Sequence, residues 1–277
     1  MVRIALRRFA VEDSFVEMTL EVLNGFYNRV KAAAPQIIDL YLFGRSSSMN
    51  AFLGREKTRL GIGTSDLDSS FFAMHDAWRG IPRIIVAQDR LSELPRQVIL
   101  GVLHHEAAHT ILHGSLEFYT FPVPMSILRL ERKGVVSKQL ARDLLYSASL
   151  AVKDYEVTRL LLEKSYVEDQ VAYNKYLLEA SEEEEKVWGS IDGNKLVRLL
   201  FLISLLKPAL CAAPLLEDER YGREVAECIA ASVSHLPIYW RRHLSGMLRV
   251  ASGFSDNTHE NVALLLDNIA ELLQVDA

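Results

Sequence analysis

The feature that most limits the possible fold of this chain is the motif HEAAH at residues 105–109, which lies within a mostly apolar run. Residues four apart lie on one face of a helix, one turn above the other. On a helix, the imidazoles of His105 and His109 can therefore both reach one Zn²⁺ at about 2.0–2.1 Å. Glu106 lies about 100° further around the helix and can reach a water beside the ion. The motif predicts a helix that carries a metal, with Glu106 as general base.

The residues around the motif agree with a helix. Pro95 suits its first turn and Gly114 suits its end. The β-branched run Ile84–Ala87 predicts a strand just before the helix. Gly101, one turn before His105, is expected to leave space above the metal.

A hydrolytic zinc site needs a third protein ligand and an open position for water. His113 follows His105 by eight residues, a rise of about 12 Å on a straight helix. It is therefore expected to support a ligand or to end the helix rather than to bind the same ion. Asp154 and Glu156 lie on a long helix predicted to begin after Ser137. They point about 200° apart, so only one of them can face the metal.

The residues that share a helix face with each carboxylate distinguish the two candidates. Asp154 shares its helix face with four residues of an apolar set: Leu150, Ala151, Val157 and Leu161. Glu156 shares its face with a more solvated set that includes Lys153 and Arg159. We therefore expect Asp154 to be the ligand, with Glu156 as the alternative. In the remaining interpretation both are surface charges paired with those two basic residues.

The stretch HHEAAHTILHG resembles the active-site helix of gluzincin-type zinc metallopeptidases, and it is most similar to the ImmA/IrrE-like group. That group carries a third ligand on a following helix in the pattern E-x-x-A-D or E-x-x-A-N. Residues 154–158 occupy this pattern, with Asp154, Val157 and Thr158 in the places of the Glu, the Ala and the last residue. The resemblance covers residues 84–162.

The resemblance implies a zincin-like α+β fold that is mainly helical, with a small N-terminal sheet packed on the motif helix and a helical C-terminal half. It implies an edge strand at residues 84–87, where an extended peptide pairs. It also implies a zinc-dependent peptidase, a hydrolase of peptide or protein substrates. Its metal ligands would be His105, His109 and Asp154, and Glu106 would be its catalytic base.

The 277 residues are long enough for one large or two modest domains. We expect a zincin-like metallopeptidase domain over residues 1–180 and a helical region over 187–277, or one single domain. The acidic run Ser181–Lys186 is the candidate boundary. Glycine and serine residues in the segment 44–70 predict turns, short strands or a loop. Residues 125–133 and 191–277 predict helices, and Asn257 and Glu260 form a cap pair before the last one.

Composition narrows the class of protein. A net charge of −5 argues against a nucleic-acid binder that neutralises phosphates. Two cysteines fit a reduced cytoplasm, and the N-terminus lacks the apolar centre of a secretory signal. The apolar segment 196–216 is interrupted by charges and prolines, so we expect a core helix and no membrane association.

Other residues and functions remain open. His75, His235, His243 and His259 are isolated and predict surface or satisfied core histidines. Tyr119 and Tyr155 are candidate donors to a developing oxyanion. The main alternative function is a catalytically inactive metallopeptidase fold that binds peptides or regulates a partner, and a further one is a helical protein without a metal.

Overall fold

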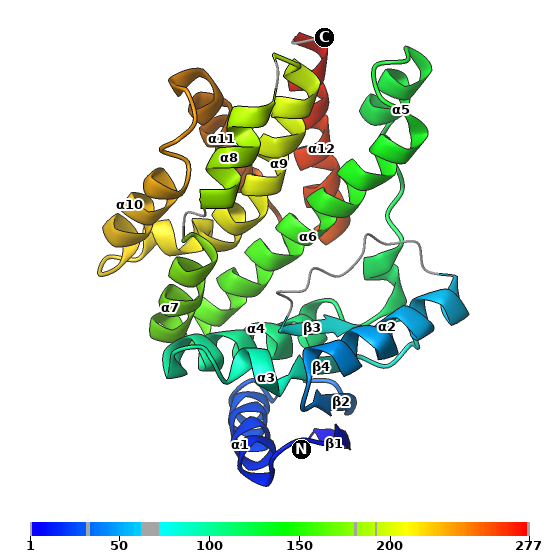
Figure 1. Cartoon of the computed structure of the whole chain (residues 1–277), viewed down its shortest axis with the longest axis vertical. Coiled ribbons are helices and arrows are strands. Elements are labelled where there is room, and N and C mark those ends of the chain that lie inside the picture. Colours follow the sequence, from blue (N-terminus) through cyan, green and yellow to red (C-terminus); the bar gives the residue numbers. More distant parts are fainter. Residues whose placement is uncertain (1, 32–33, 62–71, 180–181, 192, 276–277) are drawn as a thin grey trace. The chain divides into compact units, whose positions relative to one another are not determined.

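The computed structural model describes residues 2–31, 34–61, 72–179, 182–191 and 193–275 (Figure 1). The protein is mainly helical, and its described residues include one four-stranded mixed sheet near the N-terminus. This confirms the predicted class, mainly helical α+β with a small N-terminal sheet.

The chain forms two compact units, and the division does not follow a single cut along the sequence. Unit 1 contains Met1–Tyr119 and Glu163–Tyr173, whereas unit 2 contains Thr120–Leu162 and Asn174–Ala277. The predicted boundary at 181–186 lies inside unit 2, where most of the acidic run forms the start of helix α8 (Glu182–Ser190). Because the chain returns to unit 1 after residue 162, no local change in composition marks the division.

Unit 1 contains the four strands of the sheet and the motif helix. Its elements are β1 (Arg3–Phe9), α1 (Asp13–Arg29), β2 (Ile37–Phe43), α2 (Ser46–Leu60), β3 (Ala73–Asp76), β4 (Arg83–Ala87), α3 (Gln88–Leu91), α4 (Arg96–Leu112), a 3-10 helix (Leu116–Tyr119) and the first part of α7 (Val167–Leu177). The strand order is β1-β2-β4-β3, with β3 antiparallel to β4 and the other pairs parallel.

The predicted strand at 84–87 is confirmed as β4, but its predicted place at the sheet edge is wrong. β4 pairs with β2 on one side and with β3 on the other, and all five of its residues are buried. A strand that is apolar on both faces is typical of a sheet interior. The outer strand next to the motif helix is therefore β3.

Helices cover both faces of this sheet. Tyr41, Phe43 and Ile85 pack with Met49 and Leu53 of α2 on one face. α4 packs against β3 and β4, beside which it lies in Figure 1, and α1 packs against α4. The sheet thus provides a rigid support for α4.

Helix α2 replaces the turns and short strands predicted for much of the segment 44–70. Its buried residues Met49 and Leu53 lie one turn apart and face the sheet, and this spacing is typical of an amphipathic helix. Gly54 lies within the helix without interrupting it. The remaining residues of that segment, 62–70, lie outside the described residues.

A buried ion network joins β3, β4 and α2. Arg83 Nε donates to Asp76 Oδ1 at 2.7 Å and to Oδ2 at 2.8 Å, and Arg83 Nη1 donates to Glu56 Oε2 at 3.1 Å. Asp76 is the register partner of Arg83, and His75 is the partner of Ile84. Because side chains alternate along a strand, Asp76 facing α2 places His75 on the opposite face, toward α4.

Helix α4 confirms the predicted motif helix, but the expectation for Gly101 is wrong. A Cβ at Gly101 would lie 2.5 Å from the Asp169 carbonyl oxygen and 2.7 Å from Tyr173 Cβ. The glycine therefore allows α7 to approach α4 closely, and it does not open space above a metal. The contact is reinforced by Gln170 Nε2, which donates to the Gly101 carbonyl at 3.0 Å.

Unit 2 is helical in its described residues. Its elements are α5 (Met125–Arg132), α6 (Lys138–Glu163, which ends at the boundary), the end of α7, α8, α9 (Lys195–Ala212), a 3-10 helix (Ala213–Glu217), α10 (Gly222–Ser232), α11 (Ile238–Val250), a 3-10 helix (Ala251–Gly253) and α12 (Thr258–Val275). Ser137 Oγ accepts from the Leu140 N–H at 3.1 Å, and this confirms the predicted cap of α6. The prediction of helices at 125–133 and after residue 191 is likewise confirmed for the described residues, by α5 and by the elements from α9 to α12.

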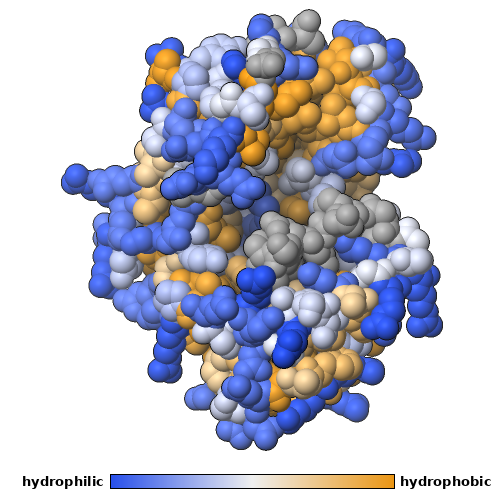
Figure 2. All heavy atoms as spheres, in the orientation of Figure 1, coloured by the Kyte–Doolittle hydropathy of each residue, from blue (hydrophilic) through white to orange (hydrophobic). Residues whose placement is uncertain are grey.

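The apolar segment 196–216 forms α9 and the turn after it. Among the described residues, Lys195–Glu217 is the one segment long and apolar enough to cross a membrane. Leu202 and Leu210 of α9 are fully buried in the core of unit 2, as expected of a core helix. On the face drawn in Figure 2, hydrophobic residues also gather in the region of α12 and α5.

Candidate metal centre

The two motif histidines face each other on α4. His105 Nε2 lies 3.1 Å from His109 Nε2, and the ring planes meet at 78°. Two ligands of a tetrahedral zinc ion, each about 2.0–2.1 Å from it, are separated by about 3.3 Å. The ring nitrogens thus lie close to the spacing that a shared ion requires.

The chemistry of these donors fits a divalent cation. Both rings are buried, with exposed fractions of 2% for His105 and 1% for His109. A neutral imidazole has one acceptor nitrogen, and a cation between two such acceptors satisfies both. Imidazole pairs suit zinc, and other divalent transition metals can occupy the same kind of site.

His113 supports this pair, as the sequence predicts. His109 Nδ1 lies 3.0 Å from His113 Nδ1, and His113 is fully buried at the end of α4. When His109 presents Nε2 to an ion, its Nδ1 carries the proton and donates to His113 Nδ1. Such a hydrogen bond fixes the tautomer and the orientation of a ligand.

Glu106 has a partner that sequence reasoning missed. His75 Nδ1 on β3 lies 3.1 Å from Glu106 Oε2, and the His75 ring stacks on His109 with centroids 3.6 Å apart at 11°. The sequence predicts a surface or satisfied core histidine at position 75, and its contact with Glu106 depends on the order of the strands, which brings β3 against α4. His75, Glu106 and His109 also offer three ligand atoms within 4.8 Å of one another.

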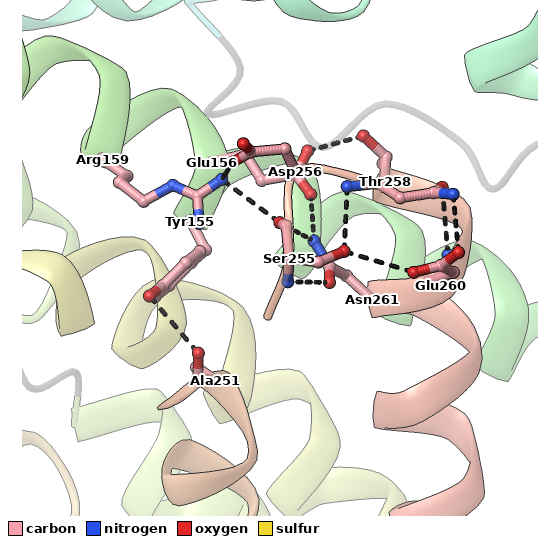
Figure 3. Close-up of polar contacts among 10 residues, drawn as sticks. Tyr155, Glu156, Arg159, Ala251, Ser255, Asp256, Thr258, Glu260 and Asn261 are labelled. Carbon is pink, nitrogen blue, oxygen red and sulfur yellow. Dashed lines mark hydrogen bonds and ion pairs between the residues drawn. The ribbon is translucent and has the colours of Figure 1, made fainter. Parts of the chain in front are cut away.

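Two tyrosines of unit 1 lie close to these groups. Burial, together with the charges of Asp76 and Glu106, raises the pKa of Tyr119, so its phenol keeps its proton at neutral pH. The centroids of the Tyr173 and His105 rings lie 5.1 Å apart. Tyr155, the second oxyanion candidate from the sequence, belongs to unit 2 and donates to the Ala251 carbonyl at 3.4 Å (Figure 3).

Unit 2 holds the two carboxylates predicted as third ligands. Glu156 Oε2 accepts from Thr258 Oγ1 at 2.8 Å, and Oε1 accepts from Asn261 Nδ2 at 2.6 Å (Figure 3). Glu156 is only 5% exposed, so its predicted solvated environment is wrong. The start of α12 covers Glu156 and uses both of its oxygens.

Asp154 has a different environment within unit 2. Its Oδ2 lies 3.5 Å from Lys207 Nζ of α9. Asp154 and Glu156 are 8% and 5% exposed, so neither is the surface charge that the remaining interpretation describes, and the Arg159 guanidinium pairs with Asp256 at 3.0 Å. Asp154 belongs to unit 2 and both motif histidines belong to unit 1, and its role as a ligand stays a prediction.

Comparisons with known proteins found no matching family model, no similar curated protein and no similar solved structure. The chemistry of the site is therefore the basis for a function. Two imidazoles that face each other can hold a metal ion. A buried carboxylate beside them can accept a proton from a water next to that ion.

Proposed function

We propose that this chain is a zinc-dependent peptidase with a zincin-like fold, acting in the cytoplasm on peptide or protein substrates. The observation that supports this most directly is the 3.1 Å approach of His105 Nε2 and His109 Nε2 on the helix that carries Glu106. His105 and His109 hold the ion in this proposal, and Asp154 completes its protein ligands.

Each residue of the site then has a defined task. A bound Zn²⁺ supplies Lewis-acid chemistry toward a peptide carbonyl and a water. Glu106 takes a proton from the attacking water and passes it to the leaving amine, so the proton balance closes. Tyr119 keeps its proton and donates a hydrogen bond to the carbonyl oxygen as negative charge develops there. The outer edge of β3 pairs with an extended substrate.

The test is the variant Glu106→Gln, assayed with a library of quenched-fluorescent peptides. We expect it to retain about one equivalent of zinc, because neither histidine changes. Hydrolysis should fall by about 10³-fold, since a general base contributes about 10²–10⁴-fold. Glu93→Gln, the same change at an exposed position just before α4, is the matched control and should cleave like the parent. Equal cleavage by Glu106→Gln and the parent would refute the mechanism.

One observation favours the alternative of an inactive peptide-binding protein. Lys207 Nζ lies near Asp154 Oδ2, so a cation of the chain itself already accompanies the proposed third ligand. If this alternative is correct, the parent holds zinc, binds peptides of the library and cleaves none of them. A purified protein with less than about a tenth of an equivalent of zinc would instead indicate a helical protein without a metal.

A further inference from the structure

We propose that His75 is the positioning residue of Glu106, and that the Arg83–Asp76 pair fixes the strand register that places it there. The inference rests on the proposed function for its effect on catalysis. Its structural part, a hydrogen bond from His75 to Glu106, can be tested without activity.

A glutamate on a helix surface loses side-chain entropy when it is held in one rotamer. An ionised carboxylate only accepts hydrogen bonds, so His75 Nδ1, at 3.1 Å, is the donor to Glu106 Oε2. This bond occupies one oxygen of the carboxylate. The second oxygen, Oε1, is then the one that receives a proton from water.

The ring of His75 is itself held in place. It stacks on His109 with an interplanar angle of 11° and lies on a strand of four residues. Among the described residues, β3 pairs with β4 alone. A slip of one residue in such a strand would turn every side chain to the opposite face.

The register of β3 is fixed from its opposite face. Arg83 is fully buried and binds both oxygens of Asp76, and it also binds Glu56 of α2. Both contacts to Asp76 come from the single Nε–H of Arg83, and hydrogen bonds between two charged groups are roughly twice as strong as those between neutral groups. Because Asp76 is held toward α2, its neighbour His75 is held toward Glu106.

The ring geometry argues against His75 as a metal ligand. The lone pairs of imidazole nitrogens lie in the ring plane, so two rings stacked at 3.6 Å and 11° direct them in nearly parallel planes. His105 and His109, with planes at 78°, direct theirs toward a common point. His75 therefore acts on Glu106, and the ion belongs to the other pair.

The first experiment measures the hydrogen bond by NMR of imidazole ¹⁵N nuclei in metal-free protein, with His75→Asn used to assign the signals. We expect His75 to be the tautomer with a proton on Nδ1, and this signal should shift in Glu106→Ala. The matched control Glu93→Ala should leave it unchanged. A proton on Nε2 alone, or no response to Glu106→Ala, would overturn the proposal whether or not the protein is a peptidase.

The second experiment compares two variants of nearly equal size. His75→Leu removes the donor, whereas His75→Asn places an amide near the position of Nδ1. We expect His75→Leu to retain zinc and KM and to lose about 10–100-fold in kcat, with most of the loss recovered by His75→Asn. In a Glu106→Gln background His75→Leu should add no further loss. Loss of zinc in His75→Leu, or an unchanged kcat, would contradict a positioning role.

The two experiments separate the proposals. If the parent cleaves no peptide, the proposed function fails and the NMR result still decides the hydrogen bond. If the parent cleaves peptides and the NMR result is negative, the proposed function stands and the inference about His75 fails.

Discussion

Glu106 in unit 1 and Glu156 in unit 2 are both buried carboxylates on helices, and their partners differ. Each oxygen of Glu156 accepts a hydrogen bond from a neutral side chain at the start of α12. Glu106 lies on the same helix as His105 and His109, about 100° around the axis from His105, and meets the imidazole of His75. Burial of an acid therefore does not by itself indicate a functional site. The chemistry of its partners separates a structural carboxylate from a candidate base.

The surroundings of Glu156 show what a structural carboxylate looks like. Asn257 Oδ1 accepts from the His259 N–H at 3.1 Å, and Asn257 Nδ2 donates to Glu260 Oε1 at 3.0 Å. This confirms the predicted cap pair of the last helix. A negative charge near a helix N-terminus is also favourable. Glu156 thus holds two side chains at the start of α12, beside a cap that Asn257 forms.

The strongest test of this comparison is His109→Ala. His109 faces His105 through Nε2 and His113 through Nδ1, so its removal takes away one ligand and the support of the site. We expect bound zinc to fall from about one equivalent to less than about a tenth, measured by elemental analysis after dialysis. His243→Ala, on α11 of unit 2, is the control and should retain full zinc. Full zinc in His109→Ala would remove the basis of the metal centre.

Glu156→Ala tests the other half of the comparison. The change leaves Thr258 Oγ1 and Asn261 Nδ2 without their carboxylate acceptor. We expect the free energy of unfolding to fall by about 3 kcal/mol, measured with urea, because hydrogen bonds to a charged group contribute about 1.5–3 kcal/mol each. Glu156→Gln keeps one acceptor oxygen and should lose less.

Zinc binding by the same variant decides the alternative ligand. A carboxylate that only binds side chains at the start of α12 can be removed without a change in zinc stoichiometry. A folded Glu156→Ala protein that binds no zinc would instead make Glu156 the third ligand, and the distinction between the two carboxylates would fail.

The next largest effect is expected for Gly101→Ala. The added Cβ would meet the Asp169 carbonyl oxygen at 2.5 Å, and backbone cannot move aside as a flexible side chain does. Overpacking of this kind costs about 1–3 kcal/mol. Gly25→Ala in α1, where a Cβ meets nothing within 4 Å, should instead raise stability by about 0.5–1 kcal/mol. Thermal unfolding of both variants measures the difference, and equal midpoints would mean that α7 does not pack on α4 as observed.

The sequence predicts elements whose signals lie within one segment. α4, α6 and β4 follow from apolar spacing, a proline or serine at the start and β-branched residues. α2 was not predicted, because its glycine and serine residues favour turns. The helix is stabilised by the packing of Met49 and Leu53 against the sheet. The bounds of the two units differ from the expected ranges, since the chain leaves unit 1 at Tyr119 and later returns to it.

The residues of the candidate site also divide into those that one segment predicts and those that depend on the fold. His105, Glu106 and His109 lie within five residues of one helix, so spacing alone brings them together. His75 is 31 residues from Glu106, and only the strand order and the register of β3 make them neighbours. The burial of Glu156 likewise depends on residues about a hundred positions later in the chain.

A smaller effect is expected at the histidine that supports the metal ligand. His113→Phe keeps a ring at the end of α4 but removes the nitrogen that faces His109 Nδ1 at 3.0 Å. Outer partners of metal ligands contribute about 10–100-fold to affinity, so the Kd for zinc should rise by that factor. Competition with a zinc-binding dye measures it. An unchanged Kd would show that His109 is oriented by packing alone.

The smallest effect is expected for a polar pair of unit 1 whose role is structural, like that of Glu156. Tyr27 Oη and Thr110 Oγ1 lie 2.8 Å apart between α1 and α4, and Thr110 Oγ1 also donates to the Ala107 carbonyl. Tyr27→Phe should therefore cost only about 1 kcal/mol and leave zinc binding unchanged.

The pH dependence of that cost has a defined sign. Burial raises the pKa of Tyr27 far above its ordinary value, an effect that outweighs the hydrogen bond with Thr110. The folded state thus holds the phenol proton more tightly than the unfolded state. The resulting stability is fully present below about pH 10 and is lost as pH rises toward the raised pKa. The difference in unfolding free energy between the parent and Tyr27→Phe should shrink above about pH 10, whereas a difference that stays constant there would show that the phenol ionises as freely in the folded state as in the unfolded state.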